Sequence, residues 1–83
     1  MDHATQTVVE FILERFAGLV PEEITKDSLL KDELGIDSLR IVELLVGLEE
    51  KLNITFDESD LNPDALVTVG DVSNLLQKYE RVR

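Results

Sequence analysis

Residues 35–39 read Gly35-Ile36-Asp37-Ser38-Leu39 and lead directly into an amphipathic run that ends at Leu52. Apolar residues at spacings of three and four along this run predict a helix from Ser38 to Leu52. Its expected core-facing side consists of Ile41, Leu44, Leu45, Leu48 and Leu52. A second stripe, expected to face solvent from the same turn as Ser38, consists of Leu39, Glu43, Val46 and Glu50. The two faces predict two functions for this helix, one in the core and one in contacts with other molecules.

The N-terminal part of the chain predicts another helix and a long loop. Apolar side chains within residues 8–16 share one helical face. Thr5 or Thr7 is expected to cap this helix, and Gly18 is expected just past its end, because glycine commonly follows the last helical residue. Residues 21–37 show only scattered apolar side chains and predict a loop that those side chains hold down. A loop of this length in a short chain is more often functional than not.

The C-terminal part predicts one short helix and one longer helix. Asp57 is expected to cap a short helix over residues 58–61, which Pro63 limits. Thr68 and Asp71 have the spacing of a capping box at the start of the last helix. The inward face of that helix consists of Val69, Val72, Leu75, Leu76 and Tyr79. Together the segments predict an all-α fold, a four-helix bundle of three longer helices and one short helix with the long loop between the first and second helices.

Composition limits the function classes further. The 83 residues predict one domain over residues 1–83, and the absence of cysteine excludes disulfides, thiolate metal sites and thiol nucleophiles. Eighteen acidic and eight basic residues give a net charge of −10, which argues against nucleic acid and anionic membranes and favours partners with basic surfaces. The sequence shows neither an apolar run near the roughly 20 residues of a membrane span nor a signal-peptide pattern. We therefore expect a cytoplasmic protein, and a monomer.

Ser38 is better suited to modification than to catalysis. A nucleophilic serine needs a neighbouring base and donors for an oxyanion, and the sequence indicates neither. We therefore expect no catalytic residue and no enzymatic activity. The ordinary alternative is that Ser38 only caps the helix, since serine at that position contributes about 0.5–2 kcal/mol relative to alanine.

The motif Asp37-Ser38-Leu39, with Gly35 before it and Glu43 after it, resembles the modification site of acyl carrier proteins. The resemblance covers nearly the whole chain in pattern and length, and it is specific over residues 35–50. It implies that Ser38 bears a 4'-phosphopantetheine arm, with Asp37 and Leu39 as the flanking residues of this cofactor site. It also implies that a separate phosphopantetheinyl transferase attaches the arm from coenzyme A, and that the terminal thiol of the arm holds acyl intermediates as thioesters.

The solvent-facing side of the predicted helix is the expected docking surface for the transferase and for acyl-loading and acyl-processing enzymes with basic surfaces. Exposed apolar side chains rimmed by charge suit transient docking. The expected partner-binding residues are Leu39, Arg40, Val42, Glu43, Val46, Glu49 and Glu50. Arg40 departs from the acidic or neutral residue common there in fatty-acid carriers, which favours a standalone carrier dedicated to polyketide or other specialised biosynthesis. The alternative is that Arg40 pairs with Asp37 or Glu43 and has no further role.

Three other functions remain open from the sequence. The first is a standalone peptidyl or aryl carrier of a nonribosomal peptide pathway. The second is an acidic protein-interaction domain that is never modified, and the third is a hydrolase that uses Ser38. Mass gain at Ser38, and the type of enzyme that loads the arm, would separate these alternatives.

A calcium-like spacing in the C-terminal part does not predict a metal site. The residues at that spacing are Asp60, Asn62, Asp64 and Asp71. Ala65 occupies the position where a calcium loop needs glycine for its sharp turn, and Pro63 stiffens the segment. We therefore expect no metal ligands.

Overall fold

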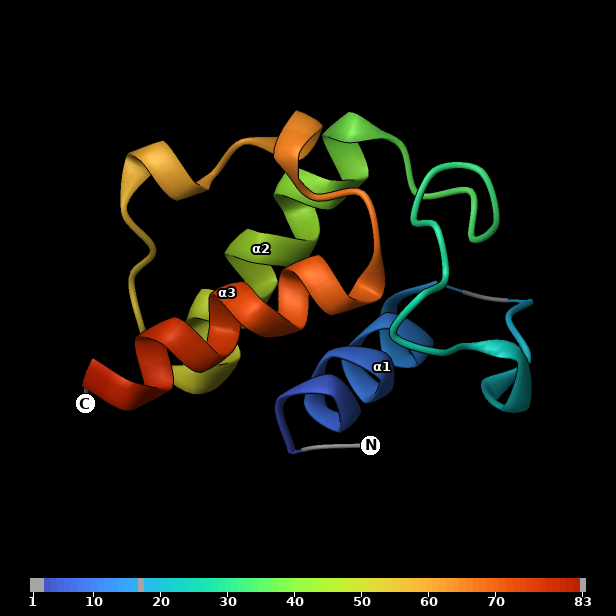
Figure 1. Cartoon of the computed structure of the whole chain (residues 1–83), viewed down its shortest axis with the longest axis horizontal. Coiled ribbons are helices and arrows are strands. Elements are labelled where there is room, and N and C mark those ends of the chain that lie inside the picture. Colours follow the sequence, from blue (N-terminus) through green and yellow to red (C-terminus); the bar gives the residue numbers. More distant parts are fainter. Residues whose placement is uncertain (1–2, 17, 83) are drawn as a thin grey trace.

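The computed structural model describes residues 3–16 and 18–82, in which three α-helices form the framework (Figure 1). They are α1 (His3–Arg15), α2 (Ser38–Leu52) and α3 (Val69–Val82). Short 3-10 turns lie in the connections, namely η1 (Pro21–Glu23), η2 (Glu58–Asp60) and η3 (Pro63–Ala65). The described residues contain no β-strand, only an isolated antiparallel bridge between Leu29 and Thr68. The all-α prediction is confirmed.

The prediction of a fourth, short helix is not confirmed. Residues 58–60 form the single 3-10 turn η2, which Asp57 caps as expected by accepting a hydrogen bond from the backbone N–H of Ser59. A separate turn, η3, follows and begins at Pro63. Proline has no backbone N–H, so it cannot continue a hydrogen-bond ladder from the preceding turn. The connection between α2 and α3 therefore consists of two turns in place of a helix.

The start of α1 lies earlier than the sequence predicted. The helix begins at His3, because Ala4 and Thr5 are buried against the core and add a turn at this end. Thr7 also lies inside the helix, where its hydroxyl donates to the carbonyl of His3 at 2.9 Å. The predicted caps at Thr5 and Thr7 were therefore wrong. Gly18 follows the helix with a φ of 85°, as expected of a glycine past a helix end.

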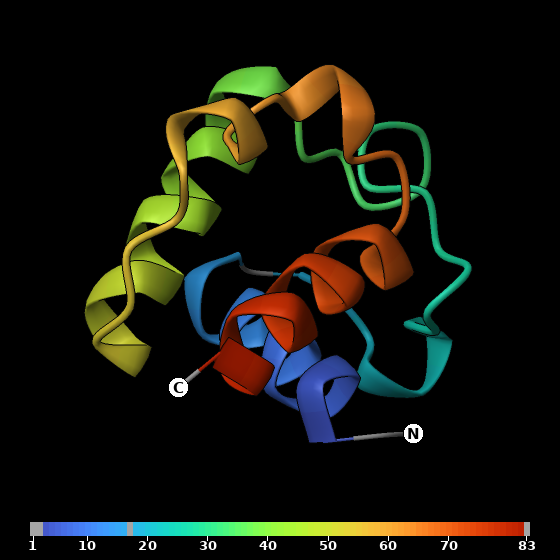
Figure 2. The same ribbon diagram turned by 60° about the vertical axis from the view of Figure 1, so that its left-hand side comes forward.

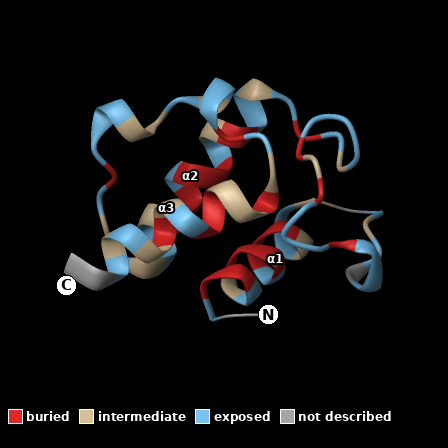
Figure 3. Cartoon of the chain, viewed as in Figure 1, coloured by how far each residue is buried: buried red, intermediate tan, exposed pale blue. Residues whose placement is uncertain are grey.

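The core lies between the three helices. α1 and α3 pack against each other, and α2 runs along one side of this pair (Figures 1 and 2). The buried sides of the three helices face inward (Figure 3). Four of the five residues predicted for the core-facing side of α2 are buried, and Leu52 is partly buried. The remaining core comes mainly from Val8, Ile12, Leu30, Val69, Val72 and Leu76.

The loop between α1 and α2 is held down as predicted. Its side chains Ile24, Leu30 and Ile36 are buried. Its backbone also bonds to the segment before α3, because the N–H of Leu30 donates to the carbonyl of Val67 at 2.9 Å. These contacts fix the position from which the chain turns into α2.

Candidate attachment site

Asp37 caps the first turn of α2. Its backbone is extended, and its carboxylate Oδ1 accepts a hydrogen bond from the backbone N–H of Arg40 at 3.0 Å. Its carbonyl accepts the N–H of Ile41 at 2.9 Å, the first bond of the helical ladder. Gly35, with a φ of 69°, supplies the left-handed turn that brings the chain to this point. The cap is therefore Asp37, and the ordinary alternative that assigned capping to Ser38 was wrong.

Ser38 is the first residue inside α2 and is partly exposed. Among residues 3–16 and 18–82, no group forms a hydrogen bond with its hydroxyl. Asp37 beside it is exposed, and Leu39 exposes 70% of its surface. The positive end of the α2 dipole lies at this turn and favours a negatively charged group there. An accessible, uncommitted hydroxyl at this position fits a phosphodiester-linked prosthetic group.

Residues 7–76 match the family described as the phosphopantetheine attachment site. The chain belongs to this family. It is 42% identical over 69 residues to the meromycolate extension acyl carrier protein of Mycobacterium leprae (strain TN), a match that covers 83% of this chain and 58% of that protein. It is 41% identical over 69 residues to the acyl carrier protein of Rhodococcus erythropolis (strain PR4 / NBRC 100887), with 83% and 74% covered. It is 35% identical over 71 residues to the acyl carrier protein of Buchnera aphidicola subsp. Baizongia pistaciae (strain Bp), with 86% and 88% covered.

These matches confirm the resemblance to acyl carrier proteins and the predicted prosthetic group, phosphopantetheine. Members of the family are carriers rather than catalysts, and they interact with modifying and biosynthetic enzymes. The chain spans less than two thirds of the length of the meromycolate extension relative.

The predicted docking residues differ in solvent exposure. Leu39, Arg40, Glu43, Val46 and Glu50 are exposed, whereas Val42 and Glu49 are partly buried. Glu49 has an intramolecular partner, because its Oε2 accepts the backbone N–H of Phe56 at 2.7 Å. Four of these exposed residues, Leu39, Glu43, Val46 and Glu50, form the outward stripe that the spacing predicted, and Arg40 lies beside it.

Two adjacent clefts follow this outward stripe along α2. A cleft of about 460 Å³ brings Asp37, Leu39, Arg40 and Glu43 together. A second cleft of about 310 Å³ is lined by Val42, Glu43, Val46 and Glu50 among others. The larger cleft opens beside Ser38, because both neighbours of Ser38 in the chain line it.

Arg15 and Phe16 also belong to this site, although no sequence pattern placed them there. Both line the larger cleft from the end of α1. The guanidinium carbon of Arg40 lies 5.9 Å from the centre of the Phe16 ring, and that of Arg15 lies 4.9 Å from the centre of the Phe11 ring. Neither predicted pair of Arg40, with Asp37 or with Glu43, comes within 4 Å in the part of the chain that the structure describes. A basic residue in the last turn of a helix is common, so the sequence carried no signal that Arg15 would meet α2.

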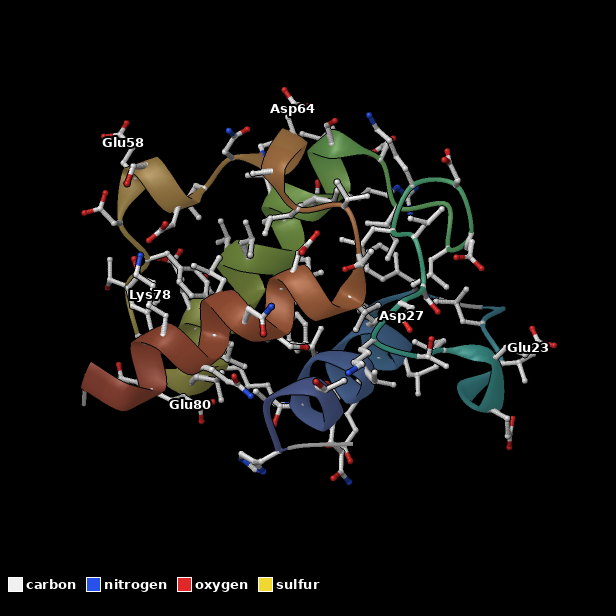
Figure 4. All side chains as sticks on the ribbon, in the orientation of Figure 1. Glu23, Asp27, Glu58, Asp64, Lys78 and Glu80 are labelled. Carbon is white, nitrogen blue, oxygen red and sulfur yellow. The ribbon has the colours of Figure 1, made fainter. Side chains whose placement is uncertain are left out.

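The remaining acidic side chains are dispersed over the molecule. Glu23, Glu58, Asp64 and Glu80 project away from different elements in Figure 4. No group of three or more potential metal ligands converges within the described residues. None of the described helices combines the length and apolar composition of a membrane span. The dispersed charges therefore indicate a solvated surface, and the site at the start of α2 remains the candidate.

A separate polar cluster of Asp57, Asp60 and Tyr79 links η2 to α3, at the opposite end of α2 from Ser38. The Tyr79 hydroxyl donates to Asp60 Oδ2 at 2.6 Å and accepts the backbone N–H of Asp57 at 2.5 Å. The hydrogen bond to Asp60 raises the pKa of Tyr79 above its usual value. The backbone N–H of Ser59 lowers the pKa of Asp57. The Tyr79 ring also packs edge-on against Phe56 at 4.9 Å between ring centres, so this cluster stabilises the fold.

Proposed function

We propose that Ser38 carries the 4'-phosphopantetheine arm and that this chain, as a monomer, presents acyl thioesters to the enzymes of a specialised biosynthetic pathway. The main support for this proposal is that Asp37 and Ser38 have different roles at the start of α2. Asp37 supplies the cap of the helix, and the neighbouring hydroxyl of Ser38 has no hydrogen-bond partner among the described residues. A serine hydroxyl that makes no hydrogen bond to a described residue and lies in the first turn of a helix is suited to accept a prosthetic group from a separate enzyme.

Attachment is a phosphoryl transfer in which this chain supplies only the acceptor. The Ser38 oxygen forms a bond to the phosphorus that bears pantetheine in coenzyme A, and adenosine 3',5'-bisphosphate leaves. The transferase supplies the base that takes the hydroxyl proton and the metal that balances the charge. The α2 dipole favours the new phosphodiester. The Asp37 carboxylate opposes it in part, so we assign to Asp37 the cap and contacts with basic groups of the transferase.

The outward stripe of α2 supports docking by transient contact. Leu39 and Val46 expose 70% and 42% of their surfaces, and Glu43 and Glu50 lie on the same stripe. Apolar contacts of this size give modest affinity, while opposite charges speed encounter. A carrier needs both properties because it must leave each enzyme after one step. Val42 and Glu49 belong to this surface as its partly buried rim.

A specialised lipid or polyketide-type pathway is favoured over general fatty-acid synthesis. The support is Arg40, an exposed cation two residues after Ser38 that forms no ion pair with a described residue. One relative named above functions, by its name, in meromycolate extension. The runner-up is a peptidyl or aryl carrier. Loading by an adenylating enzyme with amino-acid or aryl groups, but not by any acyltransferase, would establish the runner-up.

The decisive experiment is intact-mass analysis after incubation with coenzyme A, Mg²⁺ and a broad-specificity phosphopantetheinyl transferase. We expect the wild type to gain the mass of one phosphopantetheine group. Ser38→Ala should gain nothing, and Ser59→Ala, which removes an exposed serine elsewhere, should gain as much as the wild type. A wild type that gains no mass, while a known carrier in the same mixture does, would favour the acidic interaction domain. Undiminished gain on Ser38→Ala would refute the assignment of the arm to Ser38.

A further inference from the structure

The α1–α2 cleft is the larger cleft beside Ser38, where the end of α1 meets the start of α2. Its volume is about 460 Å³. Its lining residues are Arg15, Phe16, Asp37, Leu39, Arg40, Glu43 and Leu44. A surface that touches a partner at the attachment site therefore extends beyond α2 and includes the end of α1.

Two arginines without ion-pair partners, Arg15 and Arg40, line this cleft, and Arg15 also lines the second cleft beside it. In residues 3–16 and 18–82, no carboxylate lies within 4 Å of Arg15 or Arg40. By contrast, Lys51 pairs with Glu14 at 3.3 Å and Lys78 pairs with Asp60 at 3.4 Å. The guanidinium carbons of Arg15 and Arg40 lie 4.9 and 5.9 Å from the centres of phenylalanine rings, and no described residue accepts a hydrogen bond from either guanidinium group. In a chain with a net charge of −10, two unpaired arginines in one cleft form a specific binding feature.

The carboxylates of the cleft determine what kind of anion fits. Asp37 is engaged through Oδ1 as the helix cap, and Glu43 is exposed and also lines the cleft. A small free anion would meet these two negative charges together with the net charge of the whole chain. A carboxylate on a partner protein is repelled less than a free anion when the same partner surface places a basic residue next to Glu43. The mixed charges therefore favour a partner side chain over a free anion.

We propose that the α1–α2 cleft receives an Asp or Glu side chain from the docking surface of the enzymes that load or process this carrier. Arg15 and Arg40, which line the cleft from two helices, supply the positive charge that attracts that carboxylate, and Leu39 packs beside it. This inference rests on the proposed carrier function. An enzyme that presents Lys or Arg at the same place meets like charges and is rejected. Arg15 and Arg40 are therefore specificity-determining residues that act together from two helices.

The test uses a malonyl transacylase of bacterial fatty-acid synthesis whose docking surface is basic. Its kcat/KM is measured with the holo forms of wild type, R15Q/R40Q and the matched control K26Q/K31Q. The control removes the same charge from two exposed lysines outside the cleft. We expect R15Q/R40Q to raise kcat/KM about tenfold or more, through KM, and the control to raise it by less than about threefold. Equal effects of the two variants, or no gain for R15Q/R40Q, would overturn the inference.

A charge reversal on the transacylase supplies the second half of the test. A transacylase variant with Glu in place of the basic residue that faces the cleft should gain activity with the wild-type carrier and none with R15Q/R40Q. This crossed design measures the coupling between the two surfaces directly. An equal gain with both carriers would contradict a specific carboxylate contact.

Two further measurements separate the possible failures. Every variant is first weighed for complete attachment of the arm, so an unmodified wild type refutes the proposed function itself. Complete attachment without the kinetic effect refutes only the cleft inference. The Nε–H resonances of Arg15 and Arg40 are then compared between acetyl-loaded and malonyl-loaded protein. Unchanged resonances support a partner site, and a shift of both by malonyl alone would assign the cleft to an anionic cargo and overturn the partner assignment.

Discussion

Removing the Asp37 side chain should destabilise the fold, whereas removing the Ser38 hydroxyl should not. Asp37→Ala deletes the acceptor of the 3.0 Å hydrogen bond from the Arg40 N–H. Loss of a side-chain cap costs about 0.5–2 kcal/mol, and about 1 kcal/mol is the typical value. Ser38→Ala deletes a hydroxyl that has no partner among the described residues, so we expect a change within about 0.5 kcal/mol.

The assay is thermal unfolding followed by circular dichroism at 222 nm. For a chain of this size, about 1 kcal/mol corresponds to a shift in Tm of about 4–8 °C. Asp37→Asn keeps an oxygen acceptor and is the matched control, so its Tm should lie between those of Asp37→Ala and the wild type. Hydrogen exchange at the Arg40 amide should accelerate in Asp37→Ala, because this amide loses its acceptor.

The opposite order of stabilities would refute the reasoning. If Ser38→Ala lowers Tm as much as Asp37→Ala does, the serine has a structural task and the hydroxyl is not free for modification. If both variants leave Tm unchanged, the first turn of α2 does not depend on its cap. Either result would remove the main structural support for Ser38 as the attachment residue.

Three further predictions concern packing, the polar cluster and the last helix. Gly47→Ala should lower the free energy of unfolding by about 1 kcal/mol, because the new Cβ would lie 2.5 Å from Phe11 Cζ. Denaturant titration should show that Phe11→Leu lowers the free energy of unfolding less in this variant than in the wild type. Tyr79→Phe should cost about 0.5–1.5 kcal/mol at neutral pH. The hydrogen bond to Asp60 raises the pKa of Tyr79 in the folded state, so the stabilisation by the Tyr79 hydroxyl is present below the unfolded pKa near 10 and is lost as pH rises through the folded pKa. Urea titrations from pH 7 to 11 should therefore show a steeper decrease in the free energy of unfolding for the wild type than for Tyr79→Phe. Asp71→Ala should cost about 0.5–2 kcal/mol, since Oδ2 accepts two backbone N–H groups at 2.9 and 3.0 Å before α3; a urea midpoint equal to that of the wild type would contradict this.

Local signals predicted the parts of the fold that depend on neighbours in sequence. α2 has the predicted bounds because its apolar period is strong, whereas its two caps, Asp37 and the left-handed Asn53, were identified only from the structure. The capping box at α3 is present because it needs only Thr68 and Asp71. The motif at Ser38–Leu39 is contiguous, so the sequence alone was enough to propose it as the attachment site.

The parts that sequence could not predict depend on contacts between distant segments. The first turn of α1 forms because Ala4 and Thr5 are buried by the rest of the chain, and the sequence signals at Thr5 and Thr7 suggested a later start. The bond from Leu30 to Val67 orders the long loop, and no local signal in either residue indicates it. The four-helix count failed for a local reason, because Asn62 caps a separate turn that begins at Pro63 and residues 58–60 form one turn only.

The α1–α2 cleft itself depends on Gly47, which lines the neighbouring cleft together with Arg15. Gly47 is buried in α2, and a Cβ there would lie 2.5 Å from the Phe11 ring and 3.1 Å from a guanidinium nitrogen of Arg15. The missing side chain therefore lets α1 approach the α2 backbone, and this approach brings Arg15 into the same cleft as Arg40. Any side chain at position 47 must move Phe11 or Arg15, so we expect Gly47→Ala to alter selectivity between basic and acidic docking surfaces in the same direction as R15Q. A change in stability without any change in selectivity would show that the packing of α1 and the charge of the cleft are independent.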